Sequence, residues 1–82
     1  MIDEIDILER LGNQDIKAFK EICMEFLEPL ENFAFSLLND ANKSREVVTD
    51  VFSKIWATKG FENASLPLLG FFQEQVRAAC LK

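Results

Sequence analysis

Apolar residues recur every three or four positions along most of this 82-residue chain, which is the spacing of one buried face on a helix. In the first segment the apolar positions are Ile2, Ile5, Leu8 and Leu11. They predict a short amphipathic helix that ends near Gly12, after which Asn13 or Asp15 is expected to provide the N-cap of the next helix.

The second helical segment follows this cap and ends before Asn39 and Asp40. Its apolar positions are Phe19, Ile22, Cys23, Phe26, Leu30, Phe33, Ala34, Leu37 and Leu38. Pro29 lies inside this run. Because proline lacks a backbone donor and crowds the preceding turn, we expect a kink or a break near residue 28.

The third helix is predicted over residues 44–57, with Ser44 as its N-cap and Glu46 in its first turn, where a carboxylate complements the helix dipole. One face is continuously apolar and comprises Val48, Val51, Phe52, Ile55 and Trp56. The opposite side carries Glu46, Thr49, Asp50 and Ser53. This helix is therefore expected to present an acidic polar face opposite its apolar one.

Residues 58–65 are predicted to form a polar loop, after which Ser65 caps a fourth helix with Pro67 in its first turn. The buried stripe of that helix is predicted to comprise Leu69, Phe72, Val76 and Cys80. Three Gly and two Pro leave few turns for a sheet of many strands. The sequence thus predicts an all-α protein, a small bundle of about four helices that forms a single domain over residues 1–82.

Composition also indicates the compartment in which the protein is expected. Residues 1–11 carry five charged side chains, which is not the pattern of a secretory leader, and no apolar run approaches the length of a membrane span. Cys23 and Cys80 both lie among apolar neighbours. We therefore expect two buried, reduced thiols in a cytoplasmic protein that does not associate with membranes.

The net charge of −5 is unevenly distributed: residues 1–42 carry three basic and ten acidic side chains, whereas residues 43–82 carry six basic and four acidic ones. Only the second half could contact a phosphate backbone, and then weakly. The chain has no His and no Tyr, its two Cys are far apart and its Gly are scattered. We therefore expect no catalytic residues, no metal site and no cofactor.

Three blocks of sequence carry a resemblance to a known family. Residues 11–19 read Leu-Gly-Asn-Gln-Asp-Ile-Lys-Ala-Phe, and residues 29–34 read Pro-Leu-Glu-Asn-Phe-Ala. Residues 44–56 read Ser-Arg-Glu-Val-Val-Thr-Asp-Val-Phe-Ser-Lys-Ile-Trp. In this order and without gaps, the blocks resemble region 2 of the extracytoplasmic-function (ECF) sigma factors of bacterial RNA polymerase, in the sigma-70 family. The last helix matches less fully, through Gly70-Phe71-Phe72 and Val76-Arg77.

The resemblance implies a transcription initiation domain that binds the clamp helices of the largest catalytic subunit of core RNA polymerase. It assigns polymerase binding to Glu46, Thr49, Asp50 and Ser53. Glu46 and Asp50 keep the family's charge, whereas Thr49 replaces a Gln, so we expect weaker docking. Without the resemblance, a solvated helix face is the favoured interpretation, because surface charges usually contribute little.

The resemblance also implies melting of the promoter minus-ten element and capture of an unstacked base. Arg77 matches a basic residue of the family, and the residues predicted to bind DNA are Lys54, Lys59, Phe61, Asn63, Phe71, Arg77 and Lys82. Such capture needs a positive groove and aromatic stacking platforms. The alternative for Phe61 and Phe71 is that they cover the edge of the core. Ala78 replaces a family Asn, and Glu25, Glu31 and Asn32 stand where basic residues are common, so DNA binding is expected to be weak.

Two other functions stay open at this point. One is a degenerate sigma-like interaction module that binds polymerase or an anti-sigma factor without binding promoter DNA. The other is a helical bundle that self-associates through exposed Phe residues. A complete ECF factor continues into a second helical domain that reads the minus-thirty-five element, so we expect the chain to be either a domain of a longer factor or a stand-alone relative.

Overall fold

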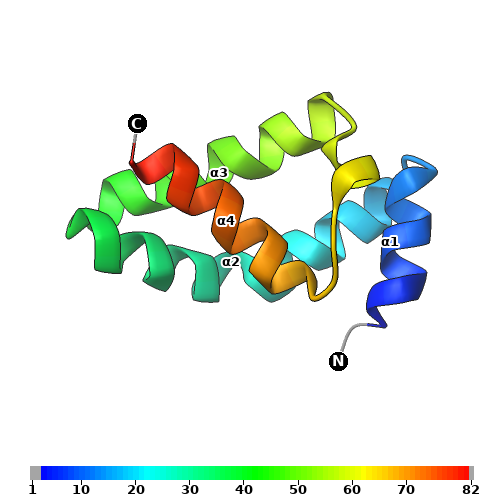
Figure 1. Ribbon diagram of the computed structural model, residues 1–82, viewed down its shortest axis with the longest axis horizontal. Helices are drawn as coiled ribbons and strands as arrows, with labels where there is room; N and C mark the ends of the chain where they lie inside the picture. Colours follow the sequence, from blue (N-terminus) through cyan, green and yellow to red (C-terminus); the bar gives the residue numbers. More distant parts are fainter. Residues whose placement is uncertain (1–2, 82) are drawn as a thin grey trace.

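The computed structural model describes residues 3–81, which form four α-helices, one short 3-10 helix and no strand (Figure 1). The elements in chain order are α1 (Glu4–Gly12), α2 (Ile16–Leu38), α3 (Ala41–Ala57), η1 (Gly60–Asn63) and α4 (Leu68–Cys80). Helices α2 and α3 are the longest, α4 packs against both, and α1 packs against α2 and η1. The predicted all-α fold of about four helices is confirmed.

Helix α2 is continuous through Pro29, so a break near residue 28 is wrong. Figure 1 shows that α2 is bowed along its length and not divided into two helices. Asp15 is its N-cap, since its carboxylate accepts a hydrogen bond from the backbone N–H of Lys17. Apolar side chains of α2 before and after Pro29 pack against α3 and α4. These contacts keep the helix continuous although Pro29 has no backbone N–H to donate.

Helix α3 begins three residues earlier than predicted, because Asp40 and not Ser44 is its N-cap. The Asp40 carboxylate accepts a hydrogen bond from the backbone N–H of Lys43. Ser44 lies inside the helix and is buried, and its hydroxyl donates to the carbonyl oxygen of Asp40. The predicted polar face is unaffected by this shift, since it depends only on the helical phase of residues 46–53.

Helix α4 also begins differently from the prediction. Pro67 precedes the helix as its N-cap, follows a cis peptide bond and provides no side-chain cap, and Ser65 does not cap it. The first free amide of α4 finds its partner elsewhere: the N–H of Leu68 donates to a carboxylate oxygen of Glu4 in α1. A residue from the first helix thus takes the capping role at the start of the last.

The predicted loop over residues 58–65 contains η1, whose Phe61 turns into the core. Lys59 adopts the left-handed backbone conformation (φ 56°), and this reverses the chain after α3. Gly60 then lies close to α3, because a Cβ atom at this position would be 3.3 Å from Cγ2 of Ile55. These two residues bring Phe61 back beneath the end of α3.

The core is built around Phe72 of α4, which is fully buried. Its ring lies 5.3 Å from the ring of Phe52, 5.7 Å from that of Phe26 and 6.2 Å from that of Phe61, measured between centroids. Such tilted and edge-on arrangements are the favourable ones for aromatic pairs. Because these rings come from α2, α3, η1 and α4, one side chain ties four elements together.

Some predicted core positions are wrong. In α1 the buried residues are Ile7 and Leu11, whereas Ile5 is 70% exposed and Ile2 lies outside the described residues. In α4 the buried stripe starts at Leu68 and not at Leu69, which is half-buried. Leu37 of α2 is also exposed.

Cys23 and Cys80 are free thiols, each half-buried and not fully buried as predicted. Burial raises the pKa of both thiols. Within residues 3–81, the helices are too short or too polar to cross a bilayer.

Candidate functional site

The outward side of α3 carries the four residues predicted to bind polymerase. Glu46, Thr49, Asp50 and Ser53 are all exposed. They follow one another at intervals of three, one and three positions, which places them on one face of the helix. Residues of the opposite face (Val48, Phe52 and Ile55) are buried against the rest of the bundle. The structure therefore brings these four side chains together on one free surface, hereafter the α3 face.

The flanks of α3 fix the direction of this face. Toward α2, the Nε of Arg45 donates to a carboxylate oxygen of Glu31 at 3.1 Å, and Trp56 stacks on Phe19 of α2 with a centroid distance of 4.7 Å. Toward α4, Val51 and Ile55 pack into the core. Because both flanks are occupied, α3 cannot roll without breaking contacts on one side, and the α3 face is held outward.

A shallow depression of about 230 Å³ lies where the end of α3, η1 and the first half of α4 meet. Its lining includes Lys54 and Thr58 from α3, Asn63 from η1, and Phe71 and Gln75 from α4. It therefore combines one cation, two side-chain amides, a hydroxyl and an aromatic ring. Such a set can contact phosphate and hydrogen-bond to a base, while the ring offers a surface for stacking.

A second hollow, of about 170 Å³, follows the same line between α3 and α4. It shares Lys54 and Gln75 with the depression and extends it toward Ala78 and Ala79. The walls beyond Lys54 are mostly aliphatic, so polar chemistry is concentrated at the η1 end. Ala78 lies in this wall, at the position where the resemblance would place an Asn.

The predicted DNA-binding residues divide into three groups. Lys54, Asn63 and Phe71 are brought together in the depression. Phe61 is only 4% exposed, and its ring faces Phe19, Trp56 and Phe72, so it covers the core, and no face of its ring is free for a base in this structure. The third group comprises Lys59 and Arg77, which are not part of the depression lining, and Lys82, which lies outside the described residues.

Lys59 is exposed at the turn after α3, and Lys82 lies outside the described residues. Arg77 is exposed on α4, where its guanidinium donates to the carboxylate of Glu74 at 2.7 Å. This hydrogen bond lowers the pKa of the Glu74 carboxyl and raises that of Arg77. Glu74 thus compensates the charge of Arg77, and Lys54 is the one cation in the depression lining.

Two residues of the depression, Thr58 and Gln75, were missed by the sequence analysis. The signal was present in the spacing: Thr58 follows Lys54 by four positions, and Gln75 follows Phe71 by four, so each lies one turn further along the same helix face. A search for charged and aromatic residues alone passes over such neutral polar side chains.

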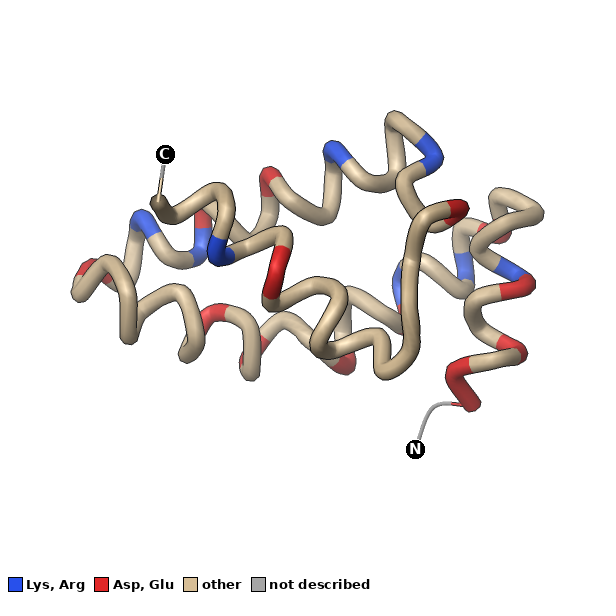
Figure 2. The backbone as a smooth tube through the Cα atoms, in the orientation of Figure 1, with Lys and Arg blue, Asp and Glu red and all other residues tan. Residues whose placement is uncertain are grey.

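Figure 2 shows acidic segments concentrated along α1 and α2, whereas both signs of charge occur along α3. No three His, Cys, Asp or Glu side chains within residues 3–81 are grouped as a metal ion would require. Comparison of the chain with known protein families, with curated proteins and with solved structures finds no match.

Proposed function

We propose that this protein is a transcription initiation factor domain of the sigma region 2 type, which docks on core RNA polymerase through the α3 face. The observation that carries the proposal is the clustering of Glu46, Thr49, Asp50 and Ser53 on one exposed side of a helix whose other sides are packed. The sequence resemblance described above assigns these same residues to polymerase binding.

The physical role of the face is electrostatic docking. The carboxylates of Glu46 and Asp50 lie one helical turn apart, so they can pair with Arg or Lys side chains on a partner helix. Pairs of this kind speed association and fix the orientation of the partner. Thr49 offers a short hydroxyl where an amide would provide both a donor and an acceptor, which is why we expect docking weaker than that of a complete factor.

The depression at η1 supplies the second part of the proposal, contact with the minus-ten element. Lys54 would neutralise a phosphate, Asn63 and Gln75 would hydrogen-bond to an exposed base, and Phe71 would stack against it. Burial of Phe61 and compensation of Arg77 by Glu74 reduce the available contacts. We therefore expect the interaction with DNA to be weak and strongly salt-dependent.

The docking claim is tested with Asp50→Arg. A reversed charge at the centre of the α3 face should weaken binding to core polymerase about tenfold or more, because an attractive pair becomes a repulsive one. Binding is measured by isothermal titration with core polymerase, and circular dichroism checks that helix content is unchanged. Glu9→Arg makes the same charge change on exposed α1 and should bind normally. Equal affinity for the two variants would exclude docking through α3.

The second candidate function is an interaction module that binds polymerase or an anti-sigma factor without touching DNA. Ala78 in the wall between α3 and α4, together with the burial of Phe61, favours it over full promoter recognition.

Fluorescence anisotropy with a minus-ten non-template oligonucleotide separates the two functions. Salt-sensitive binding that is lowered several-fold by Lys54→Ala supports the transcription factor. No binding even at low salt supports the interaction module. Lys43→Ala, which removes an exposed lysine at the opposite end of α3, is the matched control.

A further inference from the structure

A groove of about 430 Å³ lies between α1 and α2, on a part of the molecule that the proposed function does not use. Four carboxylates line it, two from the α1 segment and two from α2, around the apolar side chains of Ile7 and Met24. The carboxylates are those of Asp3, Asp6, Glu21 and Glu25. Hereafter it is called the α1–α2 groove.

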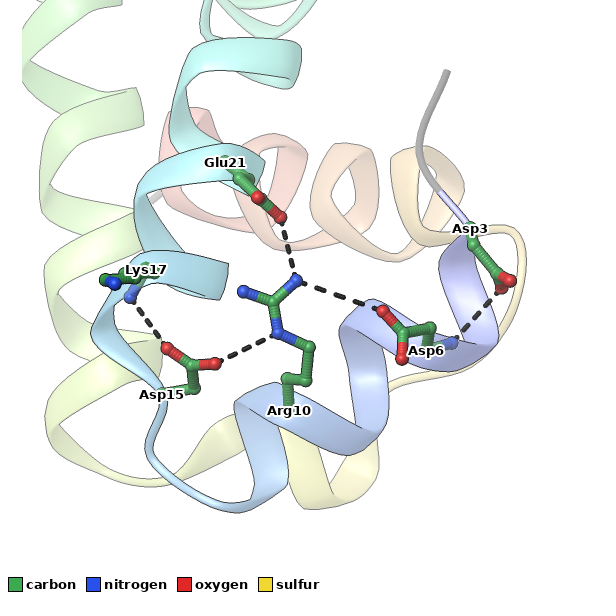
Figure 3. A network of polar contacts seen from close by, with 6 residues as sticks. All are labelled: Asp3, Asp6, Arg10, Asp15, Lys17 and Glu21. Carbon is green, nitrogen blue, oxygen red and sulfur yellow. Dashed lines mark hydrogen bonds and ion pairs between the residues drawn. The ribbon is translucent and has the colours of Figure 1, made fainter.

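The one cation in the groove lining, Arg10, is already engaged by the protein itself (Figure 3). Its Nε donates to Asp15 at 2.9 Å, and its Nη1 donates to Glu21 at 3.2 Å and lies 3.9 Å from Asp6. Within residues 3–81, Glu25 takes part in no ion pair. With four carboxylates and a single guanidinium, the groove keeps a net charge of −3.

Exposed apolar side chains of α2 lie beside these carboxylates. Met24, at the rim of the groove, is 83% exposed, and Leu27, three positions further along α2, is 37% exposed. This spacing places the two side chains on one helix face. No described element covers this face. A flexible, polarisable Met side chain adapts readily to the apolar residues of a partner.

We propose that the α1–α2 groove docks a basic amphipathic helix of a partner protein. The apolar side of that helix would rest on Met24 and Leu27, while its Lys or Arg residues would pair with Glu25 and the other carboxylates of the groove. Helices commonly bind in grooves in this way, through anchors three, four and seven positions apart.

The charge and shape of the groove argue against other occupants. A nucleic acid or an anionic membrane would be repelled by a net charge of −3, and no three carboxylates converge as a metal ion requires. A second copy of this chain is also a poor fit. Its exposed α3 lysines, Lys43 and Lys54, are interspersed with Glu46 and Asp50, so that helix offers no uniformly basic surface.

The test uses a labelled synthetic 18-residue amphipathic helix with Leu on one face and Lys on both flanks. We expect fluorescence anisotropy to show salt-sensitive binding. Glu25→Lys should weaken it about tenfold, and Met24→Gln should weaken it several-fold. A peptide with Glu in place of every Lys should not bind. Leu81→Ala, which removes a side chain that is 65% exposed elsewhere, should have no effect.

Two cross-checks keep this inference separate from the proposed function. Asp50→Arg should leave peptide binding unchanged, and Glu25→Lys should leave polymerase binding unchanged. Amide chemical shifts should move along α1 and the first half of α2 when the peptide is added. The proposal is overturned if the peptide does not bind, if Glu25→Lys and Met24→Gln bind like the parent protein, or if the shifts move mainly on α3 and α4.

Discussion

The two ends of the molecule are held together by different forces. At the α1 end, two buried side chains, Ile7 and Leu11, are supplemented by polar contacts: Arg10 bridges to α2, and Glu4 caps α4. Around α3 and α4, aromatic and aliphatic side chains gather about Phe72. Apolar packing depends little on ionisation, whereas the ion pairs of Arg10 require charged carboxylates. The two ends should therefore respond differently to substitution and to pH.

The largest effect is expected at the aromatic centre. Phe72→Ala removes a fully buried ring that contacts four other Phe side chains, and should lower the free energy of unfolding by about 3–5 kcal/mol. Urea denaturation followed by circular dichroism measures the change. The matched control is Leu81→Ala, at a position that is 65% exposed, which should shift stability by no more than about 0.5 kcal/mol. A similar loss in both variants would contradict the proposed centre of the core.

A smaller effect is expected where α1 meets α4. Glu4→Ala removes the acceptor of the Leu68 N–H and should cost about 1 kcal/mol, the usual value of a helix cap. Glu9→Ala, on the exposed side of the same helix, makes the same chemical change without losing a cap. Urea midpoints for the two variants should differ, and identical midpoints would show that the contact between the helices contributes nothing.

The smallest effect is a pH dependence at the α1 end. The hydrogen bond from Arg10 lowers the pKa of Asp15 below its ordinary value of 3.8. A lowered pKa in the folded state stabilises the protein above the unfolded-state value, and this contribution is lost as the pH falls through the folded-state pKa.

The free energy of unfolding should therefore fall less for Arg10→Gln than for the parent protein as the pH is lowered from about 5 to about 2. Urea midpoints measured across this range compare the two, with Arg45→Gln as the control because Arg45 forms its ion pair with Glu31 instead. Parallel pH profiles for the parent protein and Arg10→Gln would show that the Arg10–Asp15 contact does not contribute to the pH dependence of stability.

The sequence predicted the helices better than their ends. The apolar spacing located α2, α3 and α4 because each has a long buried face. The start of α3 was misplaced because Asp40 and Ser44 are both good capping residues, and Ala41, Asn42 and Lys43 carry no apolar signal between them. Only the three-dimensional contacts decide between two such caps.

The same limit applies to α1 and to the candidate site. In α1, apolar residues lie on more than one side, so the docking against α2 and η1, not the spacing, selects Ile7 over Ile5. The α3 face followed directly from helical phase. The buried position of Phe61 could not be predicted in this way. It depends on the left-handed turn at Lys59, which no residue pattern in the loop signals.

The contact between Glu4 and Leu68 joins residues 64 positions apart in the chain. The Leu68 amide, in the first turn of α4, therefore has its hydrogen-bond partner only while α1 is docked. That turn leads directly to Phe71, which lines the depression at η1. Removal of α1, or its displacement by a partner in the α1–α2 groove, would expose the Leu68 amide to exchange with solvent and loosen one wall of the depression. The hydrogen-exchange rate of the Leu68 amide would thus report whether α1 is docked.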